Sequence, residues 1–310
     1  MAVTFDALMS TTLQKYCEKA LVDNITTSNA IFWSLKDKAY KPLDGGEVIA
    51  VPIMSGLSGA VGSYSGFDLL NTSNQQGMAR AEFNWKFYYA TITISGSDET
   101  RNTGEAAIIN LLGGKVAQAE ASLRDAMNTD LFADGTGNGN KALDGLAIAI
   151  DSAGTYGGVD RATYTWWQAT ETAVSGVLTI ARLRKGFNDA SSGGKDHPNL
   201  LISDQDEFEA YEGLLQPDQR FTDSKMADGG FQTLLFKQQP WVWDENATAG
   251  VVYLVNTNYL TLYYHRTRNF NSTPFEKPTN QDAKVSMILW AGNLTGTNPR
   301  RQTKLTGLTD

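Results

Sequence analysis

The sequence predicts an α+β fold. Two segments, residues 47–54 and 80–95, are rich in the β-branched and aromatic residues that favour strands. An amphipathic pattern with helical spacing follows over residues 102–132, and short strand-like and helix-like segments alternate from residue 177 onward. Strands mixed with helices in this order are typical of the α+β class.

The composition fits a soluble globular protein, with 41% hydrophobic and 19% charged residues among 310. No apolar run reaches the ~18 residues that a membrane span needs, and the N-terminus shows no basic segment followed by an apolar one, so we expect no secretion signal. Cys17 is the single cysteine, which excludes an internal disulfide framework and suits a reducing cytoplasm. The net charge of −8 argues against tight nucleic-acid binding, which needs clustered Lys and Arg.

The two predicted strands form an arm that has no core of its own. They are joined by residues 55–77, a segment too long and irregular for a hairpin turn, with glycines at Gly56, Gly59, Gly62, Gly66 and Gly77. Because two strands alone are marginally stable in water, the arm must lie on something else. We interpret that support as a neighbouring copy of the same chain. The alternative is an ordinary surface hairpin of a sandwich.

Alternation along the second strand places four aromatic residues on one face: Phe83, Trp85, Phe87 and Tyr89. The apolar residues then move to even positions at Ile92 and Ile94, which requires one extra residue near Tyr88 to Ala90 and predicts either a β-bulge or a change of packing partner there. Pro52 has no amide hydrogen for a ladder, so the first strand is predicted to be an edge strand.

The long helix is predicted from one apolar stripe with spacings of three and four: Ile108, Leu112, Val116, Ala119, Leu123, Met127 and Leu131. Asn102 and Glu105 form a capping-box-like start, and the pattern stops before Gly135. About 30 residues give roughly 45 Å of helix. The stripe would also suit half of a coiled coil, but we expect a helix packed along the side of a sheet.

The rest of the chain contains shorter elements. Residues 4–36 look helical, and Thr179 or a neighbour opens a helix over 177–190. Ser203 with Asp206 is predicted to cap a helix that ends at Leu215. The predicted strands are 199–202, 231–236, 240–243, 251–255, 259–264 and 283–290, the last of them followed by a polar tail.

Catalytic patterns are poor. The two histidines, His197 and His265, stand in polar surroundings far apart in sequence, so neither a triad nor a histidine metal site is supported. The glycine-rich residues 135–139 follow a helix and lack a phosphate-binding Lys-Ser/Thr pair, which indicates a turn. The acidic cluster of Asp204, Asp206, Glu207 and Glu209 fits the first turn of a helix, and the alternative is a Ca²⁺ or acid–base site. Arg300, Arg301 and Lys304 form the one basic spot, which we assign to a solvated or subunit-contacting tail.

A series of short motifs runs along the chain from about Thr4 to Gly307: SYSGFD, EFNWK, ISGSDE, NTGEAAIINLLGGKVAQAE, LFADGTGN, DGLA, LTIARLR, DHPNLLIS, YEGLLQPDQRF, MADGGFQTLLFK, YLVNTNYL and PTNQDAKV. In this order they resemble a family of tailed-bacteriophage major capsid proteins with the Hong Kong 97 fold. Each motif alone is weak, whereas their common order is specific.

The resemblance implies a Hong Kong 97-like capsid fold within the α+β class. Its parts would be an N-terminal arm at 1–46, an extended E-loop hairpin at 47–97, a P-domain with a long spine helix at 98–143, an A-domain at 144–260, and a return to the P-domain with a C-terminal tail at 261–310. The E-loop of one subunit would lie across the P-domain of its neighbour. The expected subunit-interface residues are Tyr64, Phe67, Phe83, Trp85, Phe87 and Tyr89.

The implied function is that of a major capsid protein of a tailed double-stranded DNA bacteriophage. It would self-assemble into the hexamers and pentamers of an icosahedral head, in the virion, after assembly in the bacterial host cytoplasm. Expected partners are the chain itself, a separate scaffolding protein, a portal, decoration proteins and packaged DNA that is bound without sequence specificity; no membrane, enzyme activity, cofactor or metal ion is implied. The net charge of −8 suits a wall that slightly repels DNA.

Two alternatives from other classes remain open. A bacterial encapsulin would share the shell fold but would assemble alone into a small particle around a cargo enzyme. An enzyme or a carbohydrate-binding module would use Trp166, Trp167 or Trp241 as a stacking platform.

Overall fold

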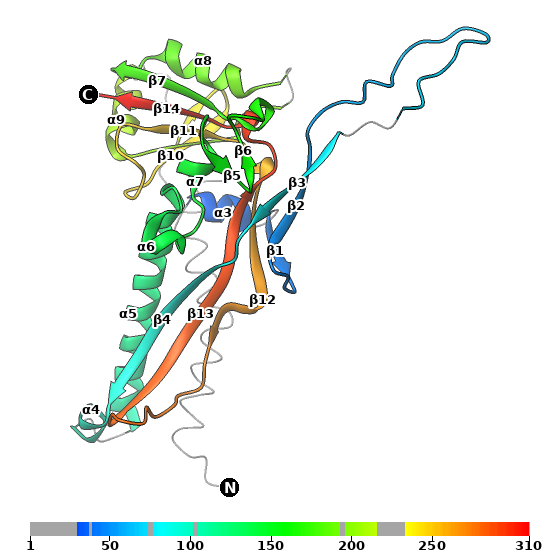
Figure 1. Cartoon of the computed structure of the whole chain (residues 1–310). Helices are drawn as coiled ribbons and strands as arrows, with labels where there is room; N and C mark the ends of the chain where they lie inside the picture. Colours follow the sequence, from blue (N-terminus) through cyan, green and yellow to red (C-terminus); the bar gives the residue numbers. More distant parts are fainter. Residues whose placement is uncertain are drawn as a thin grey trace.

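The molecule consists of two main β-sheets, a long helix and a projecting hairpin arm (Figure 1). The computed structural model describes residues 30–36, 39–73, 77–101, 105–192, 196–215 and 233–309. The mixture of helices and strands confirms the predicted α+β class.

The four-stranded sheet forms the elongated lower part of the molecule in Figure 1 and has the order β1-β12-β13-β4. Its strands are β1 (Tyr40–Leu43), β12 (Leu260–Ser272), β13 (Ala283–Gly296) and β4 (Lys86–Ser95). Both β12 and β13 continue beyond their predicted ends at 264 and 290. In β13 the polar residues Asn293 and Thr295 are buried with hydrogen-bond partners, which polarity in the sequence does not indicate.

Helix α5 (Glu105–Phe132) packs along β4, as predicted, after the short helix α4 (Gly96–Arg101). The described members of its apolar stripe are all buried: Leu112, Val116, Ala119, Leu123, Met127 and Leu131. Buried residues of β4, such as Ala90 and Ile92, lie in the same core cluster. The helix therefore uses its stripe against a sheet. The predicted capping residue Asn102 lies outside the described residues.

The six-stranded sheet forms the upper part and has the order β7-β14-β11-β8-β10-β9. Its strands are β7 (Thr170–Gly176), β14 (Thr303–Leu308), β11 (Val252–Val255), β8 (Leu200–Ser203), β10 (Gln239–Trp243) and β9 (Thr233–Phe236). Helices α8 (Ile180–Ala190) and α9 (Gln205–Leu214) pack on one face, where Phe187 and Tyr211 both meet Phe236 edge-on. Alternate residues on the other face, such as Ile202 and Val255, join the main core.

The caps of these two helices were predicted with mixed success. Thr179 caps α8, since its side chain accepts a hydrogen bond from the Arg182 amide at 3.3 Å. The predicted cap of α9 was wrong, because Asp204 and not Ser203 accepts from the Glu207 amide. Ser203 instead completes β8, and its hydroxyl accepts a hydrogen bond from the buried Trp241 indole at 2.9 Å.

The predicted polar tail after residue 290 was also wrong. Residues 303–308 form β14, which lies between β7 and β11 inside the upper sheet, and the preceding 3₁₀ turn is η5 (Pro299–Arg301). The Lys304 ammonium pairs with Asp151 at 3.1 Å and Glu171 at 3.4 Å, so the buried charge on this strand is not left unpaired. Strand β7, which the sequence patterns did not indicate, pairs in parallel with β14.

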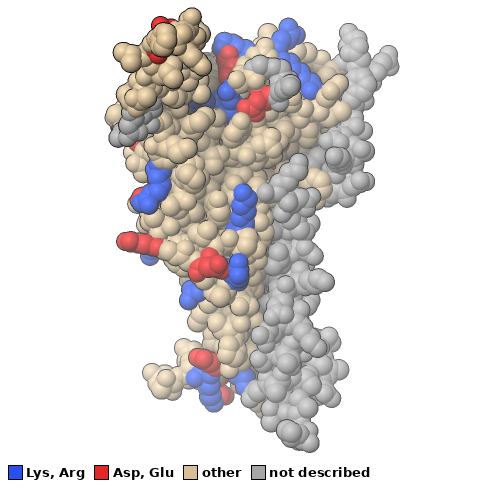
Figure 2. Space-filling model, turned by 90° about the vertical axis from the view of Figure 1, so that its right-hand side faces the viewer, with Lys and Arg blue, Asp and Glu red and all other residues tan. Residues whose placement is uncertain are grey.

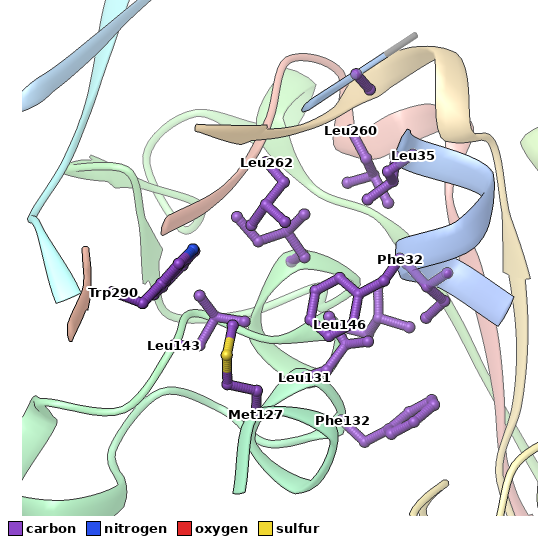
Figure 3. Close-up of a cluster of buried hydrophobic side chains, with 14 of the residues drawn as sticks. Phe32, Leu35, Met127, Leu131, Phe132, Leu143, Leu146, Leu260, Leu262 and Trp290 are labelled. Carbon is purple, nitrogen blue, oxygen red and sulfur yellow. The ribbon is translucent and has the colours of Figure 1, made fainter. Parts of the chain in front are cut away.

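The main core lies where the two sheets meet. Figure 3 shows apolar side chains from α3 (Ala30–Lys36), the end of α5, α7 (Leu146–Ala149), β12 and β13 converging there. Of the predicted N-terminal helical segment, only this α3 lies within the described residues. The glycine-rich residues 135–139 turn the chain at Gly135 and continue into the short α6 (Gly137–Asn140), whose Asn138 and Gly139, like Gly135, have positive φ.

Candidate subunit interface

The arm begins as a regular hairpin. Strands β2 (Ile49–Met54) and β3 (Met78–Phe83) pair antiparallel, from Ile49 opposite Phe83 to Met54 opposite Met78. Their inner faces are buried, whereas the chain beyond Ser55 and Gly77 extends away from the body (Figure 1). Within the described residues β2 pairs with β3 alone, which agrees with the edge position predicted from Pro52.

The projecting loop exposes large apolar side chains to an unusual degree. Their exposed fractions range from 61% at Leu70 to 106% at Phe67, and the set along the arm is Met54, Leu57, Val61, Tyr64, Phe67, Leu69, Leu70 and Met78. Asp68 is the single charged residue in residues 55–77. Single exposed apolar residues are ordinary, but a continuous series marks a surface that contacts another molecule.

The structure separates the predicted interface residues into two groups. Tyr64, Phe67, Phe87 and Tyr89 are exposed, at 68%, 106%, 60% and 72%. Phe83 is only 2% exposed, in edge-on contact with Tyr156, so it belongs to the core of its own chain and not to an exposed interface.

Trp85 is half-buried at the base of the arm. Its indole donates a hydrogen bond to the Gly46 carbonyl at 2.9 Å, and its ring meets His265 edge-on at 5.6 Å between centroids. These contacts are within its own chain, so replacing Trp85 would disturb the fold as well as any subunit contact.

A break in the strand at Asn84 and Trp85 explains why Phe83 is buried whereas Phe87 is exposed. The shift lies earlier than the predicted Tyr88 to Ala90 and is a change of packing partner, not a bulge: β3 ends at Phe83 and pairs with β2, whereas β4 begins at Lys86 and pairs with β13. The break shifts the buried positions from odd numbers to even ones, so that Phe87 points to the opposite face from Phe83.

Buried polar groups hold this break in place. The Asn84 carbonyl accepts a hydrogen bond from Asn293 Nδ2 at 2.9 Å, and the same nitrogen donates to Asp144 Oδ2 at 2.7 Å. Lys86, buried on β4, places its ammonium 3.2 Å from Asp144 Oδ1 and donates to the Asn140 carbonyl at 2.8 Å. Since each of these groups has a partner, the network fixes the direction in which the arm leaves the body.

A neighbouring tyrosine links the same region to the long helix. Tyr88 donates to Asp130 Oδ2 at 2.5 Å and accepts from the Leu143 amide at 2.7 Å. Burial, followed by the adjacent carboxylate of Asp130, raises the pKa of Tyr88, so its hydroxyl keeps its proton and continues to donate.

The outer surface of β4 offers a second candidate contact area. Phe87 and Tyr89 project from it, and Met287 of β13, which lies opposite Thr91, is 42% exposed. A groove of about 400 Å³ runs between β4 and α5 and is lined by Tyr89, Thr91, Lys115 and Ser122 among others. Figure 2, which views the molecule from the right-hand side of Figure 1, shows charged side chains scattered over a largely uncharged surface.

An insertion at residues 151–168 supports the base of the arm. It contains the hairpin β5 (Thr155–Tyr156) and β6 (Val159–Asp160) and the turn η2 (Thr165–Trp167). The Gly157 carbonyl accepts a hydrogen bond from the Glu82 amide at 2.8 Å, and a Cβ on Gly157 would lie 2.8 Å from the Phe83 ring. Only glycine, with its φ of +59°, fits this approach.

Arg161 holds the insertion together from inside. Its guanidinium is fully buried and donates to the carbonyls of Ile148, Ala149, Ala153 and Trp167 at 2.8–3.3 Å. Sequence reasoning missed this residue, since nothing in the pattern distinguishes it from a surface arginine.

The acidic cluster predicted from the sequence has a structural role at the start of a helix. Asp204, Asp206 and Glu207 lie at the start of α9, where carboxylates complement the helix dipole. Among the described residues no group of three or more His, Cys, Asp or Glu side chains is arranged to hold a metal ion. In that same part of the chain, no helix has the length and apolarity needed to cross a membrane.

Two of the three tryptophans predicted as a stacking platform for a carbohydrate are buried, which contradicts that role for them. Trp167 and Trp241 are 1% and 0% exposed, and each indole donates a hydrogen bond within the chain. A stacking platform needs exposed ring faces, so only Trp166 would remain.

The chain has the Hong Kong 97-like capsid fold, as its motifs predict, and solved structures with this fold match nearly its whole length. A chain of the cyanophage A-1(L) capsid matches with a TM-score of 0.66 and 17% identity, covering 89% of this chain and 93% of that one. A chain from the capsid of the native GTA particle matches at 0.58 and 12%, covering 89% and 90%. The holo-SrpI encapsulin complex of Synechococcus elongatus matches at 0.58 and 9%, covering 90% and 88%. No family model and no curated protein matches the sequence.

Proposed function

We propose that this protein is the major capsid protein of a tailed double-stranded DNA bacteriophage. It assembles into hexamers and pentamers that form an icosahedral shell around the genome. The arm is the single observation that carries the proposal, because its apolar side chains have no cover within the described chain and gain it from a neighbouring subunit.

The contact mode follows from the shape of the subunit. The arm and the body surface of one copy are different patches, so a contact between them is heterologous and repeats head to tail. Such contacts close into rings when the rotation between copies is a whole fraction of a turn. Tyr64 and Phe67 of one arm, together with Phe87 and Tyr89 of β4, are the proposed interface residues.

In the terms of the Hong Kong 97 fold, the arm corresponds to the E-loop and α5 to the spine helix of the P-domain. The upper sheet with α8 and α9 corresponds to the A-domain, and β14 adds the C-terminal residues to that sheet. We further propose a separate scaffolding protein, a portal and decoration proteins as partners, with assembly in the host cytoplasm. The net charge of −8 suits a wall that contacts DNA without binding it tightly.

An encapsulin-type nanocompartment is the second candidate, and the likeness to the encapsulin of Synechococcus elongatus favours it specifically. The two functions differ in their contents and in their need for a scaffold. An encapsulin closes alone around a protein cargo, whereas a phage shell encloses DNA and reaches its proper size with a scaffolding protein.

Electron microscopy combined with sedimentation velocity tests the proposal. The protein is expressed alone and together with the proteins encoded beside its gene. Capsomer rings or closed shells support a shell protein, and a change of shell size on co-expression favours the phage function over the encapsulin. A stable monomer under both conditions would overturn both.

A further inference from the structure

A pocket lies at the root of the arm, where the hairpin meets the body. Its cavity measures about 540 Å³. The end of β2, the turn η2 and the segment before β14 enclose it. The lining includes Pro52, Met54, Leu57, Trp166, Arg300 and Arg301. We refer to this cavity as the root pocket.

The root pocket combines an apolar wall with a positive edge. Arg300 is exposed and forms no ion pair within the described part of the chain. Arg301 is held in place, because its Nε lies 3.2 Å from Asp196 Oδ2 while its side chain remains 24% exposed. Trp166 is half-buried and contacts Tyr164 at 5.9 Å between ring centroids. A group with an apolar surface and a negative charge is therefore favoured in this pocket.

The tip of the arm has these two properties. Phe67 and Leu69 are exposed at 106% and 101% and flank Asp68, the single charge in residues 55–77. The Asp68 carboxylate accepts a hydrogen bond from the Ser65 amide at 2.8 Å, which fixes the turn at the tip. Its second oxygen, Oδ1, is left for another partner.

The distance between the tip of the arm and its own root pocket indicates that the tip contacts a second copy of the chain. From Ser55 to Asp68 an extended chain spans roughly 40 Å, so an extended arm places its tip far from its own root pocket. Subunits that repeat head to tail at a comparable spacing bring the tip of one arm to the root of the next.

We propose that the root pocket receives the arm tip of a neighbouring copy, with Asp68 beside Arg300 and Arg301 and with Phe67 against the apolar wall. This inference rests on the proposed function and names the partner surface of the arm. The contact pairs opposite charges at the edge of an apolar patch, so it fixes the register of neighbouring subunits.

Charge reversal and rescue test this contact. Asp68→Arg and Arg300→Asp are made singly and together, and the concentration at which half of the protein assembles is measured by sedimentation. We expect each single variant to raise that concentration by about tenfold or more, and the double variant to recover most of the loss. Asp68→Asn keeps the acceptor for the Ser65 amide and removes the charge, so it distinguishes the effect of the charge on assembly from the effect of the turn.

Glu245→Arg, in an exposed turn after β10, is the matched control and should assemble normally. The contact would be overturned, and the proposed function left intact, if both single variants assembled at the same concentration as the wild-type protein. The same holds if the double variant recovered none of the loss. Normal shells from Arg300→Asp with less enclosed nucleic acid would assign Arg300 to DNA and would equally overturn it. Failure of the wild-type chain to assemble, both alone and with the proteins encoded beside its gene, would instead overturn the proposed function.

Discussion

Phe83 and Phe87 lie four residues apart in one extended segment, yet their exposed fractions are 2% and 60%. The difference arises at Asn84 and Trp85, where the strand is interrupted and the buried face changes parity. The break is fixed from outside the strand by Asn293 and Asp144, which are remote in sequence. Alternation along the sequence showed that a shift is needed, but these tertiary hydrogen bonds decide where it falls.

Replacing each of the two phenylalanines tests which one stabilises the fold and which one contributes to assembly. Phe83→Ala should lower the free energy of unfolding by about 3–5 kcal/mol, since it leaves a cavity against Tyr156. Phe87→Ala should change it by no more than about 0.5 kcal/mol and should weaken assembly instead. Chemical denaturation of the unassembled protein and sedimentation of the assembled one measure the two effects. Similar loss of stability in both variants would contradict the assignment.

Asp151 links the insertion to β14 and makes stability depend on pH. Burial opposes ionisation of its carboxyl, but hydrogen bonds from the Ala153 amide and Lys304 outweigh it, so the pKa of Asp151 is below its ordinary value. A carboxyl with a lowered pKa in the folded state stabilises the protein above its unfolded pKa of about 3.9 and loses that contribution as the pH falls through its folded pKa.

We therefore expect the free energy of unfolding to fall below about pH 4 and to fall less steeply in Asp151→Asn. Denaturant titrations of both proteins between neutral pH and about pH 3 measure this difference. Identical slopes in the two proteins would show that the pairing of Asp151 with Lys304 contributes nothing.

At the scale of elements, α5 and the arm differ in how they are stabilised. Helix α5 buries its stripe on β4 within the same chain, so its position follows from periodicity alone. The arm has two paired strands and a loop whose large side chains remain exposed. An element of this kind contributes little to the stability of the subunit and much to the contact it makes.

Shortening the arm tests whether it contributes to assembly and not to the stability of the subunit. Replacing residues 56–76 by Asn-Gly keeps Ser55 and Gly77, which are already hydrogen-bonded at 2.9 Å, and offers a two-residue turn. The free energy of unfolding should change little, and assembly should be lost in sedimentation velocity. A full-length variant with Leu57, Val61, Phe67 and Leu69 changed to Ser should behave in the same way. Shells formed by both variants would exclude the arm from assembly.

Elements with strong local patterns could be predicted from the sequence, whereas those defined by distant partners could not. The α5 stripe, the Pro52 edge strand and the Thr179 cap depend on neighbouring residues. Strand β14 has a polar sequence and is stabilised by ion pairs of Lys304 with residues far along the chain. The exposed members of the candidate interface were predicted, but the burial of Phe83 and the role of Arg161 were not.

At the scale of the whole molecule, most of the large exposed apolar residues in the described part of the chain lie on the arm and the outer surface of β4. The upper sheet buries one face against α8 and α9 and the other in the main core. The lower sheet buries one face against α5. The large exposed apolar residues concentrate on the arm, with Phe87 and Tyr89 on β4, so these surfaces are the ones that assembly would cover.

Oxidative footprinting of side chains, before and after assembly, tests that central claim most directly. Tyr64, Phe67 and Tyr89 are exposed in the subunit, and Trp241, which is buried, reports an intact fold in both states. We expect oxidation of the three exposed residues to fall sharply on assembly while that of Trp241 stays low. Equal oxidation of Tyr64 and Phe67 in free and assembled protein would contradict the account, because the arm would then remain uncovered in the shell.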